Sequence, residues 1–187
     1  MLRAARLDLQ QHLDLADLQP GGDPLVPHVE HVGPEAGQLV QSRITGAFEG
    51  VRKGRPDLPI EVFVRIDGRG LREKSKKLIS DFLNRHPKDK HILIAAATDS
   101  SALGAVDAVR EHKREKHVAI VGQDCIAEAI AEIQKDKSPL IGSVSHEPSS
   151  YGPSLIHLGL SLLRGQTVPP YNYVTHKMVT RTSLLSR

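Results

Sequence analysis

Three clusters of polar residues follow short apolar segments of the chain, and their side chains are of the types that bind small polar ligands. The clusters are Asp67-Gly68-Arg69-Gly70, Thr98-Asp99-Ser100 and Gln123-Asp124-Cys125. Several hydrogen-bond acceptors facing one crevice would suit a ligand rich in hydroxyl donors. Asp99 and Asp124 also have a structural interpretation, because a carboxylate at the start of a helix accepts bonds from the first backbone N–H groups. Both interpretations are open for each residue taken alone.

Arg43 is the cationic candidate for the same crevice. It lies near the start of a predicted helix, and its guanidinium would add a planar fork of donors to the acceptors. The alternative is an arginine exposed on the surface of that helix.

The motifs do not favour an enzyme or a metal site. Gly68 and Gly70 form a G-x-G after a predicted strand, but the third glycine of a dinucleotide-binding loop is absent. Cys125 has no histidine that its spacing designates as a base, so no nucleophile and base can be named. The segment His28-Val29-Glu30-His31 lacks the H-E-x-x-H spacing and is interpreted as a solvated loop. We therefore expect no catalytic residue, no metal and no cofactor.

Composition narrows the class of partner. The chain has 187 residues, with 25 Lys and Arg against 22 Asp and Glu, and a formal net charge of +3. This charge is too small to indicate a nucleic-acid surface. Three Phe, three Tyr and no Trp supply few rings for base stacking. No apolar run reaches the length of about 18 residues that a membrane-spanning helix needs.

The elements that must position the polar clusters follow from the apolar periodicity. A helical stripe covers 38–53, and strand patterns begin near 60, 91, 117 and 140, with one helical pattern in each gap. Strand, helix and strand in this order form parallel crossover units. The pattern predicts an α/β fold with a three-layer, doubly wound parallel sheet. Ligands of such sheets bind at the carboxyl ends of the strands, where the three clusters lie.

The first 36 residues have a different character. Acidic residues interrupt the apolar positions of the first 18, so the segment has no continuous signal-peptide core as it stands. Proline and glycine then follow closely at 20–27, which predicts an irregular segment.

Several ordered motifs resemble the type I periplasmic sugar-binding proteins, the solute receptors of ABC transporters. They cover about 145 residues, from 37 to 182, and include Ser42-Arg43, Thr98-Asp99 with Ala102-Leu103-Gly104-Ala105, Val121-Gly122-Gln123-Asp124, Ile141-Gly142-Ser143-Val144, Pro148, Tyr151-Gly152 and LLRGQTVPP at 162–170. Lac-repressor-like regulators are related, so the effector domain of a transcriptional regulator is the alternative function. The chain lacks the upstream DNA-binding helix-turn-helix of those regulators and has Ile-Gly-Ser-Val where they usually have Leu-Thr-Thr, which favours the solute receptor.

The resemblance implies a clamp of two lobes that closes on a monosaccharide or polyol and delivers it to the membrane subunits of a transporter, outside the cytoplasm. It implies that Arg43, Thr98, Asp124 and His146 contact the ligand, with Thr98 replacing the usual Asn and His146 replacing the usual Gln. The residues that it implies as supporting are Asp67, Asp99 and Gln123. The loop 67–70 lacks the aromatic ring that many sugar binders offer there, which points toward a polyol or an unusual sugar.

The resemblance also implies that the lobe preceding residue 37 is missing. Residues 37–182 would be the C-terminal lobe, 1–36 a segment outside the family and 183–187 a tail. The helix expected at 148–166 would cross to the missing lobe, and 172–180 would return as a strand. This helix is apolar on much of its circumference, so we expect it to promote association of the chain with itself. A truncated clamp is also expected to bind solute weakly or not at all.

Overall fold

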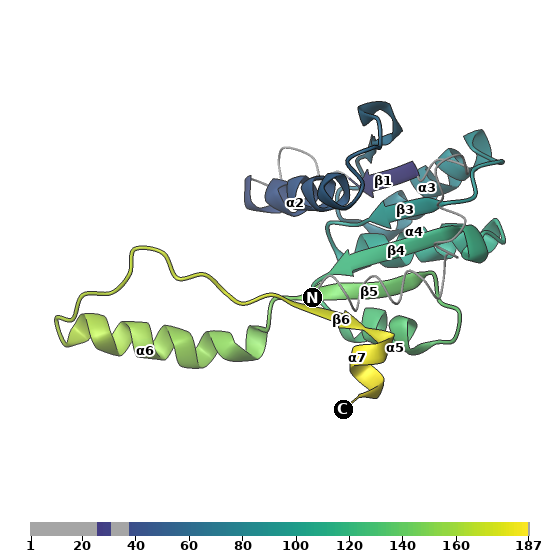
Figure 1. Ribbon diagram of the computed structural model, residues 1–187. Coiled ribbons are helices and arrows are strands. Elements are labelled where there is room, and N and C mark those ends of the chain that lie inside the picture. The colour runs from purple at the N-terminus through teal and green to yellow at the C-terminus, as the bar shows by residue number, and fades with distance from the viewer. Residues whose placement is uncertain (1–25, 31–37, 187) are drawn as a thin grey trace.

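The computed structural model describes residues 26–30 and 38–186, and Figure 1 shows them arranged around one twisted sheet. The sheet has six strands in the order β2-β1-β3-β4-β5-β6. All neighbouring strands are parallel except β5 and β6, which are antiparallel. The strands are β1 Val26–Glu30, β2 Val64–Ile66, β3 Ile92–Ala95, β4 Val118–Gln123, β5 Leu140–Ser145 and β6 Lys177–Thr180.

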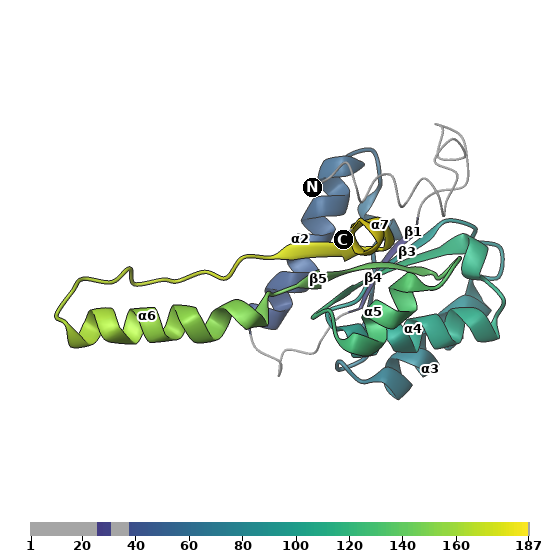
Figure 2. The ribbon, with the colours of Figure 1, turned by 90° about the horizontal axis from the view of Figure 1, so that it is seen from below.

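Helices connect the strands and cover both faces of the sheet, which gives three layers (Figure 2). One face carries α3, α4 and α5, while α2 lies on the other. The helices are α2 Gln38–Gly54, α3 Arg72–Arg85, α4 Asp99–Glu111, α5 Ala127–Gln134, α6 Tyr151–Leu163 and α7 Arg181–Leu185, with short 3-10 helices at Ile60–Val62, Glu115–His117 and Pro148–Ser150. The predicted α/β class and doubly wound arrangement are therefore confirmed.

The core follows from the two-residue alternation of the strands. Ile92 and Ile94 of β3 are buried against the helices of one face, and the residues between them point to the other face. On that other face Ala97 packs with Ile44 and Phe48 of α2. Because both faces of these strands are buried, side chains pointing to either face are apolar, and the sequence shows near-continuous apolar runs.

The reversal of strand order lies between β1 and β3. The chain leaves β1 through α2 toward β2 and returns through α3 to β3, on the other side of β1. At such a switch point the connections diverge to opposite faces and leave a crevice at the carboxyl ends of the strands. In this chain the start of α2 and the turn after β3 border the switch point.

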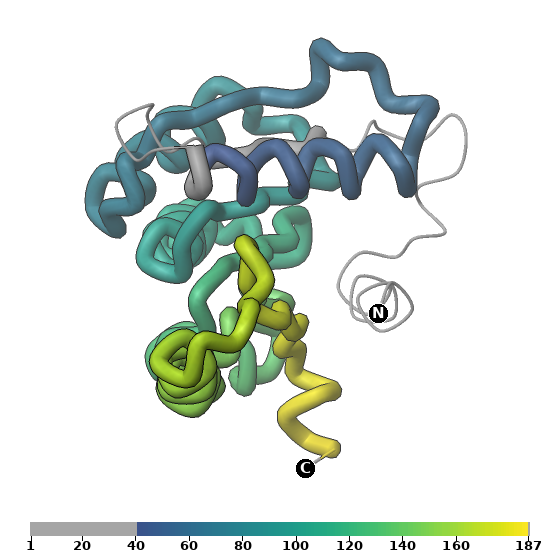
Figure 3. Tube along the Cα trace, turned by 90° about the vertical axis from the view of Figure 1, so that its left-hand side faces the viewer, coloured from purple at the N-terminus to yellow at the C-terminus, as the bar shows by residue number. Residues whose placement is uncertain are grey.

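The segment that follows β5 projects from the sheet as an arm. It consists of α6 and a return segment, residues 164–176, that leads back to β6 (Figure 1). Figure 3 shows α6 nearly end-on, because the arm projects toward the viewer in this view. Apolar side chains of the arm are exposed, and Leu163 retains 86% of its accessible surface. The remaining exposed apolar side chains of α6 are Leu155, Ile156, Leu160 and Leu162.

Four expectations about local structure are wrong. The strand expected at 172–180 is limited to Lys177–Thr180. The sequence pattern predicts an irregular segment over 1–36 with a loop at 28–31, whereas Val26–Glu30 forms β1, which lies between β2 and β3 in the sheet. The predicted tail at 183–187 belongs largely to α7, whose start is held by a capping box between Thr180 and Ser183. The strand expected from residue 60 begins at Val64, after a 3-10 helix that follows Pro59. The leucines of the first 18 residues and His31 lie outside the described residues.

Among the described residues, no helix is both long enough and apolar enough to cross a membrane.

Close packing of α3 on α4 depends on Gly104. Replacing Gly104 therefore tests the packing between these two helices. A Cβ atom at Gly104 would overlap the backbone carbonyl of Arg72. We expect Gly104→Ala to lower the free energy of unfolding by about 1–3 kcal/mol, the usual range for overpacking. Chemical denaturation followed by circular dichroism measures the change.

Gly50→Ala is the matched control, because a Cβ at Gly50 of α2 would meet nothing within 4 Å. Replacing an open helical glycine by alanine is expected to raise the free energy of unfolding by about 0.5–1 kcal/mol. Equal effects of the two substitutions would contradict the packing described.

Candidate functional site

Three of the predicted ligand residues meet at the carboxyl edge of the sheet. Arg43 Nη1 donates to Asp124 Oδ1 at 3.0 Å and to the carbonyl oxygen of Ala97 at 2.9 Å. His146 Nε2 lies 3.3 Å from the same Asp124 Oδ1. These side chains come from α2, from the turn after β4 and from the turn after β5. Residues 43, 124 and 146 are thus joined into one polar cluster, which borders the switch point between β1 and β3.

The packing of α2 determines where Arg43 points. The next residue, Ile44, is buried against the sheet together with Phe48. Arg43 is therefore held at the margin of the buried stripe, where its stem is covered and its guanidinium reaches the turn after β3. Its bond to the carbonyl of Ala97 links the two connections that diverge at the switch point.

The turn after β4 presents Asp124 in an uncommon backbone conformation. Asp124 has φ 111° and Cys125 has φ 56°, so two consecutive non-glycine residues lie in the left-handed region. Backbone bonds from Asp124 N to Val144 O at 2.9 Å and from Cys125 N to Ser143 Oγ at 3.2 Å hold the turn against β5. Among the described residues Asp124 Oδ2 has no hydrogen-bond partner, and the side chain is 34% exposed. This oxygen is available to a ligand donor.

His146 is enclosed by charged and aromatic neighbours. Its side chain is 17% exposed, and Nε2 is buried without a hydrogen bond of good geometry. The ring of His176 meets the ring of His146 edge-on, with centroids 4.9 Å apart. Burial lowers the pKa of His146, and the positive charge of Arg43 lowers it further, while Asp124 opposes the shift. The imidazole is accordingly neutral at neutral pH.

Thr98 and Asp67 lie at the same edge but use their side chains locally. The Thr98 hydroxyl caps α4 by accepting from Ser101 N at 3.3 Å. Asp67 Oδ1 accepts from Arg69 N at 3.0 Å, which closes the turn after β2. Gly70 of that turn lies against Thr98, since a Cβ on Gly70 would be 3.8 Å from the Thr98 side chain. The two clusters that begin at 67 and 98 are therefore neighbours.

The Asp99 side chain is buried and makes its hydrogen bonds within the protein. It is fully buried (0% exposed), accepts from Ser143 Oγ at 2.6 Å and from Ile126 N at 2.9 Å. A Cβ at Gly122 would overlap the Asp99 carboxylate, so residue 122 must be glycine. Burial raises the pKa of Asp99, and the bonds from Ser143 and Ile126 counteract that effect.

Gln123, the third expected supporting residue, is the last residue of β4 and is half-buried. Its backbone is paired with Val144 of β5.

Sequence reasoning did not identify His176. This residue lies in the irregular return segment, where no periodicity distinguishes one polar residue from the next. The signal that would have found it is the pairing of β5 with β6, which is not visible in the sequence alone. Among the described residues, no group of three or more His, Cys, Asp or Glu side chains is arranged to hold a metal ion.

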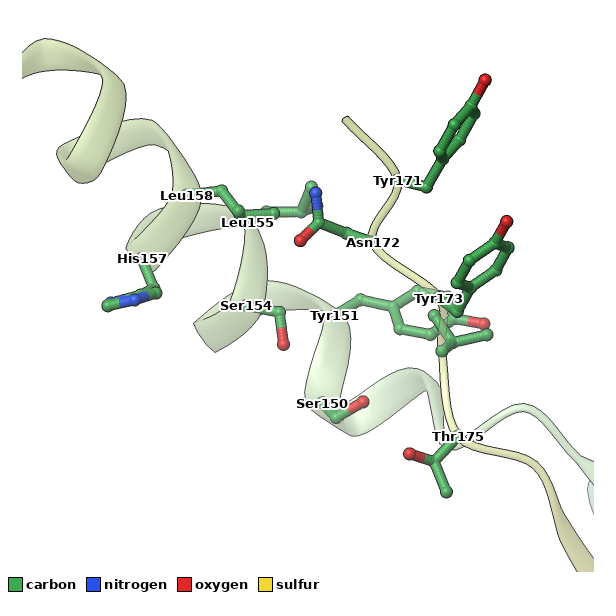
Figure 4. Close-up of a pocket in the computed structure, with 11 residues that line it drawn as sticks. Ser150, Tyr151, Ser154, Leu155, His157, Leu158, Tyr171, Asn172, Tyr173 and Thr175 are labelled. Carbon is green, nitrogen blue, oxygen red and sulfur yellow. The ribbon is translucent and has the colours of Figure 1, made fainter. Parts of the chain in front are cut away.

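A groove of about 770 Å³ lies in the arm, apart from the polar cluster. Residues of α6 form one wall and residues 171–175 of the return segment form the other (Figure 4). Tyr171 and Tyr173 stand on the return segment with their rings stacked, at a centroid distance of 6.2 Å.

A doubly wound α/β sheet with a polar cluster at its switch point has the architecture of lobes whose ligand sites lie at the carboxyl ends of the strands. Comparison with known proteins gives the family. The model of the periplasmic binding protein domain matches residues 15–167, and the chain belongs to this family. The match starts ahead of residue 37, so it includes part of the segment that the sequence pattern places outside the family.

Individual relatives are sugar-binding or solute-binding proteins. The chain is 39% identical over 95 residues to a D-ribose/D-allose-binding protein of Pseudomonas aeruginosa, covering 51% of this chain and 28% of that protein. In fold it resembles an ABC transporter solute-binding protein of Actinobacillus succinogenes with bound D-allose, at 18% identity and a TM-score of 0.74, covering 98% of this chain and 60% of that one. A solute-binding protein of Agrobacterium vitis with bound allitol gives 20% identity, a TM-score of 0.73 and coverage of 98% and 60%. The chain thus spans about 60% of the length of these structures.

The different surroundings of Asp99 and Asp124 lead to a prediction about stability. We expect Asp99→Ala to lower the free energy of unfolding by about 2–4 kcal/mol, because it removes the acceptor of both the buried Ser143 hydroxyl and Ile126 N. The matched control Asp124→Ala removes a partly exposed ion pair and is expected to cost less than about 1 kcal/mol. Urea denaturation of both variants measures the difference. An equal decrease in the free energy of unfolding for both variants would contradict a structural role for Asp99 and a ligand-contacting role for Asp124.

Proposed function

We propose that this chain forms one lobe of a solute receptor that binds a monosaccharide or polyol for an ABC transporter. The observation that carries the proposal is the cluster of Arg43, Asp124 and His146 at the switch point of a chain in the periplasmic binding protein family. The sugars and polyols bound by the similar proteins support the same class of ligand.

The chemistry of the cluster suits hydroxyl groups. Asp124 Oδ2 accepts from a ligand hydroxyl while Oδ1 stays bonded to Arg43. The other N–H groups of the Arg43 guanidinium donate to a hydroxyl or ring oxygen, and the neutral His146 ring donates or accepts according to its tautomer. Because the loop 67–70 has no aromatic residue, a flat sugar face gains no stacking there, which favours a polyol or a sugar held by its hydroxyls.

The proposed location and partners follow from the family. A solute receptor of this kind works outside the cytoplasm and docks on the membrane subunits of its transporter. The chain spans about 60% of the length of the similar structures, so a ligand in the crevice contacts one wall of the clamp in this chain. We therefore propose that the chain alone binds its ligand weakly.

Ligand binding by the chain is tested by ¹H–¹⁵N NMR titration with ribose, allose, allitol and myo-inositol. For the preferred ligand we expect a Kd of about 1 mM, which corresponds to about −4 kcal/mol. Arg43→Ala and Asp124→Ala are each expected to weaken binding about tenfold or more, since each removes a hydrogen bond to a charged group. Resonance shifts are expected near residues 43, 98, 124 and 146.

Arg85→Ala and Asp81→Ala are the matched controls, because both residues are exposed on α3, which ends at the opposite edge of the sheet. Undiminished binding by the Arg43 and Asp124 variants would overturn the site assignment. No response to any of the four ligands would overturn the proposal that this chain binds solute.

We also propose that the chain associates with itself through the exposed arm. The apolar residues of α6 lack cover from the described part of the chain, and uncovered apolar surface favours association. We expect analytical ultracentrifugation to show species larger than the 20.5 kDa monomer at high concentration. The double variant Leu155→Glu/Leu160→Glu is expected to shift the distribution toward the monomer.

Leu71→Glu is the control for added charge, because Leu71 is similarly exposed but lies at the start of α3 on the body of the lobe. A wild-type chain that sediments as a monomer and binds no apolar dye would contradict association through the arm.

A further inference from the structure

The contact between His146 and His176 is fixed by the register of two antiparallel strands. Ser145 of β5 is paired with Lys177 of β6. The residue after Ser145 and the residue before Lys177 are therefore opposite each other, one step beyond the end of the ladder. The two imidazole rings meet there at an interplanar angle of 79°. This contact is a consequence of sheet pairing and does not require a ligand.

His176 leaves one ring nitrogen of His146 directed at the polar cluster. His146 Nε2 is 3.3 Å from Asp124 Oδ1 and is buried without a hydrogen bond. A buried polar atom without a hydrogen-bond partner destabilises the folded protein. A neighbouring group that keeps His146 Nε2 in this position is therefore expected to have a role in ligand binding. The His176 ring packs edge-on against His146, which restricts rotation of the imidazole away from Asp124.

We propose that His176 is a positioning residue that holds the neutral His146 imidazole toward the ligand crevice and thereby makes solute binding weaken on acidification. The inference rests on the proposed sugar or polyol site. It adds His176 to that site and predicts that ligand binding there depends on pH. His176 itself does not touch the ligand in this proposal.

The direction of the pH dependence follows from the groups that surround His146. Arg43 of α2, Asp124 of the turn after β4 and His176 of the return segment face it, and Glu147 follows it in the chain. Burial and the charges of Arg43 and His176 disfavour the imidazolium, whereas Asp124 favours it. The pKa of His146 is therefore below the usual value, and His146 stays neutral until the solution becomes acidic.

Protonation changes the site through Asp124. The imidazolium would form an ion pair with Asp124 Oδ1 and would lose its capacity to accept a hydrogen bond. This ion pair partly neutralises the carboxylate, so Asp124 Oδ2 becomes a weaker acceptor for a ligand hydroxyl. As the pH decreases, a smaller fraction of the lobes has the neutral His146 that binds ligand. The apparent Kd therefore rises about tenfold for each pH unit below the pKa of His146.

The positioning role is tested by NMR titration of the His146 Cε1–H resonance in the chain without ligand. We compare the wild type with His176→Phe, which keeps an aromatic edge, and with His176→Ala, which removes it. The pKa of His146 is expected to rise slightly in His176→Phe and further in His176→Ala, because the alanine variant also admits water to the ring. His157→Phe, an exposed ring on α6, is the control and is expected to leave that pKa unchanged. An unchanged His146 pKa in His176→Ala would overturn the positioning role.

The effect on binding is tested by NMR titration of the preferred solute between pH 7.5 and 5. The wild type is expected to lose affinity with falling pH, whereas His146→Gln, which cannot titrate, is expected to lose much less. Equal pH dependence in the two proteins would overturn the link to His146. Absence of binding at every pH would overturn the proposed function and the proposed pH dependence of affinity. The titration without ligand would still decide whether His176 positions His146.

Discussion

The geometry of the crevice depends on the buried carboxylate of Asp99. Through its bonds to Ser143 Oγ and Ile126 N, it joins the start of α4 to β5 and to the turn after β4. That turn contains two consecutive left-handed residues, a conformation that persists only when its surroundings hold it. Asp99 and Ser143 supply this restraint, and Gly122 leaves space for the carboxylate. The exposed oxygen of Asp124 is positioned as a result.

The sequence predicts most of this architecture because apolar periodicity is local. Strands β3, β4 and β5 and the helices between them follow from alternating or helical spacing, and their order places Asp99 and Asp124 at one edge. The strand β1 was not predictable in this way, because Pro27 lacks an N–H and is unusual within a central strand. Its pairing with β2 and β3 comes from the tertiary structure. His176 was missed for a similar reason, since its contact depends on strand register rather than on local sequence.

The structure also separates residues that look alike in the sequence. Asp99 and Asp124 both follow an apolar strand and precede a helix, and spacing alone assigns each of them equally to a cap or to a ligand contact. The difference arises from packing. Residue 99 begins α4, which is buried between α3 and the sheet, whereas residue 124 stands in a turn at the open edge. Burial therefore converts one carboxylate into a structural link and leaves the other able to exchange its solvent contacts for a ligand.

The exposed arm and the polar cluster both belong to a chain that spans about 60% of the length of the similar structures. A helix such as α6 gains stability when its apolar side chains are covered, at about 1.5–3 kcal/mol for a fully buried leucine, and several of its leucines lack that cover. In the proposed function the cluster at Arg43 forms one wall of the site. Its internal bonds, from Arg43 to Ala97 O and to Asp124, exist before any ligand arrives, so the wall is already organised. Preorganisation of this kind lowers the entropic cost of binding, so in the proposed function the cluster keeps its ligand preference even where its affinity is low.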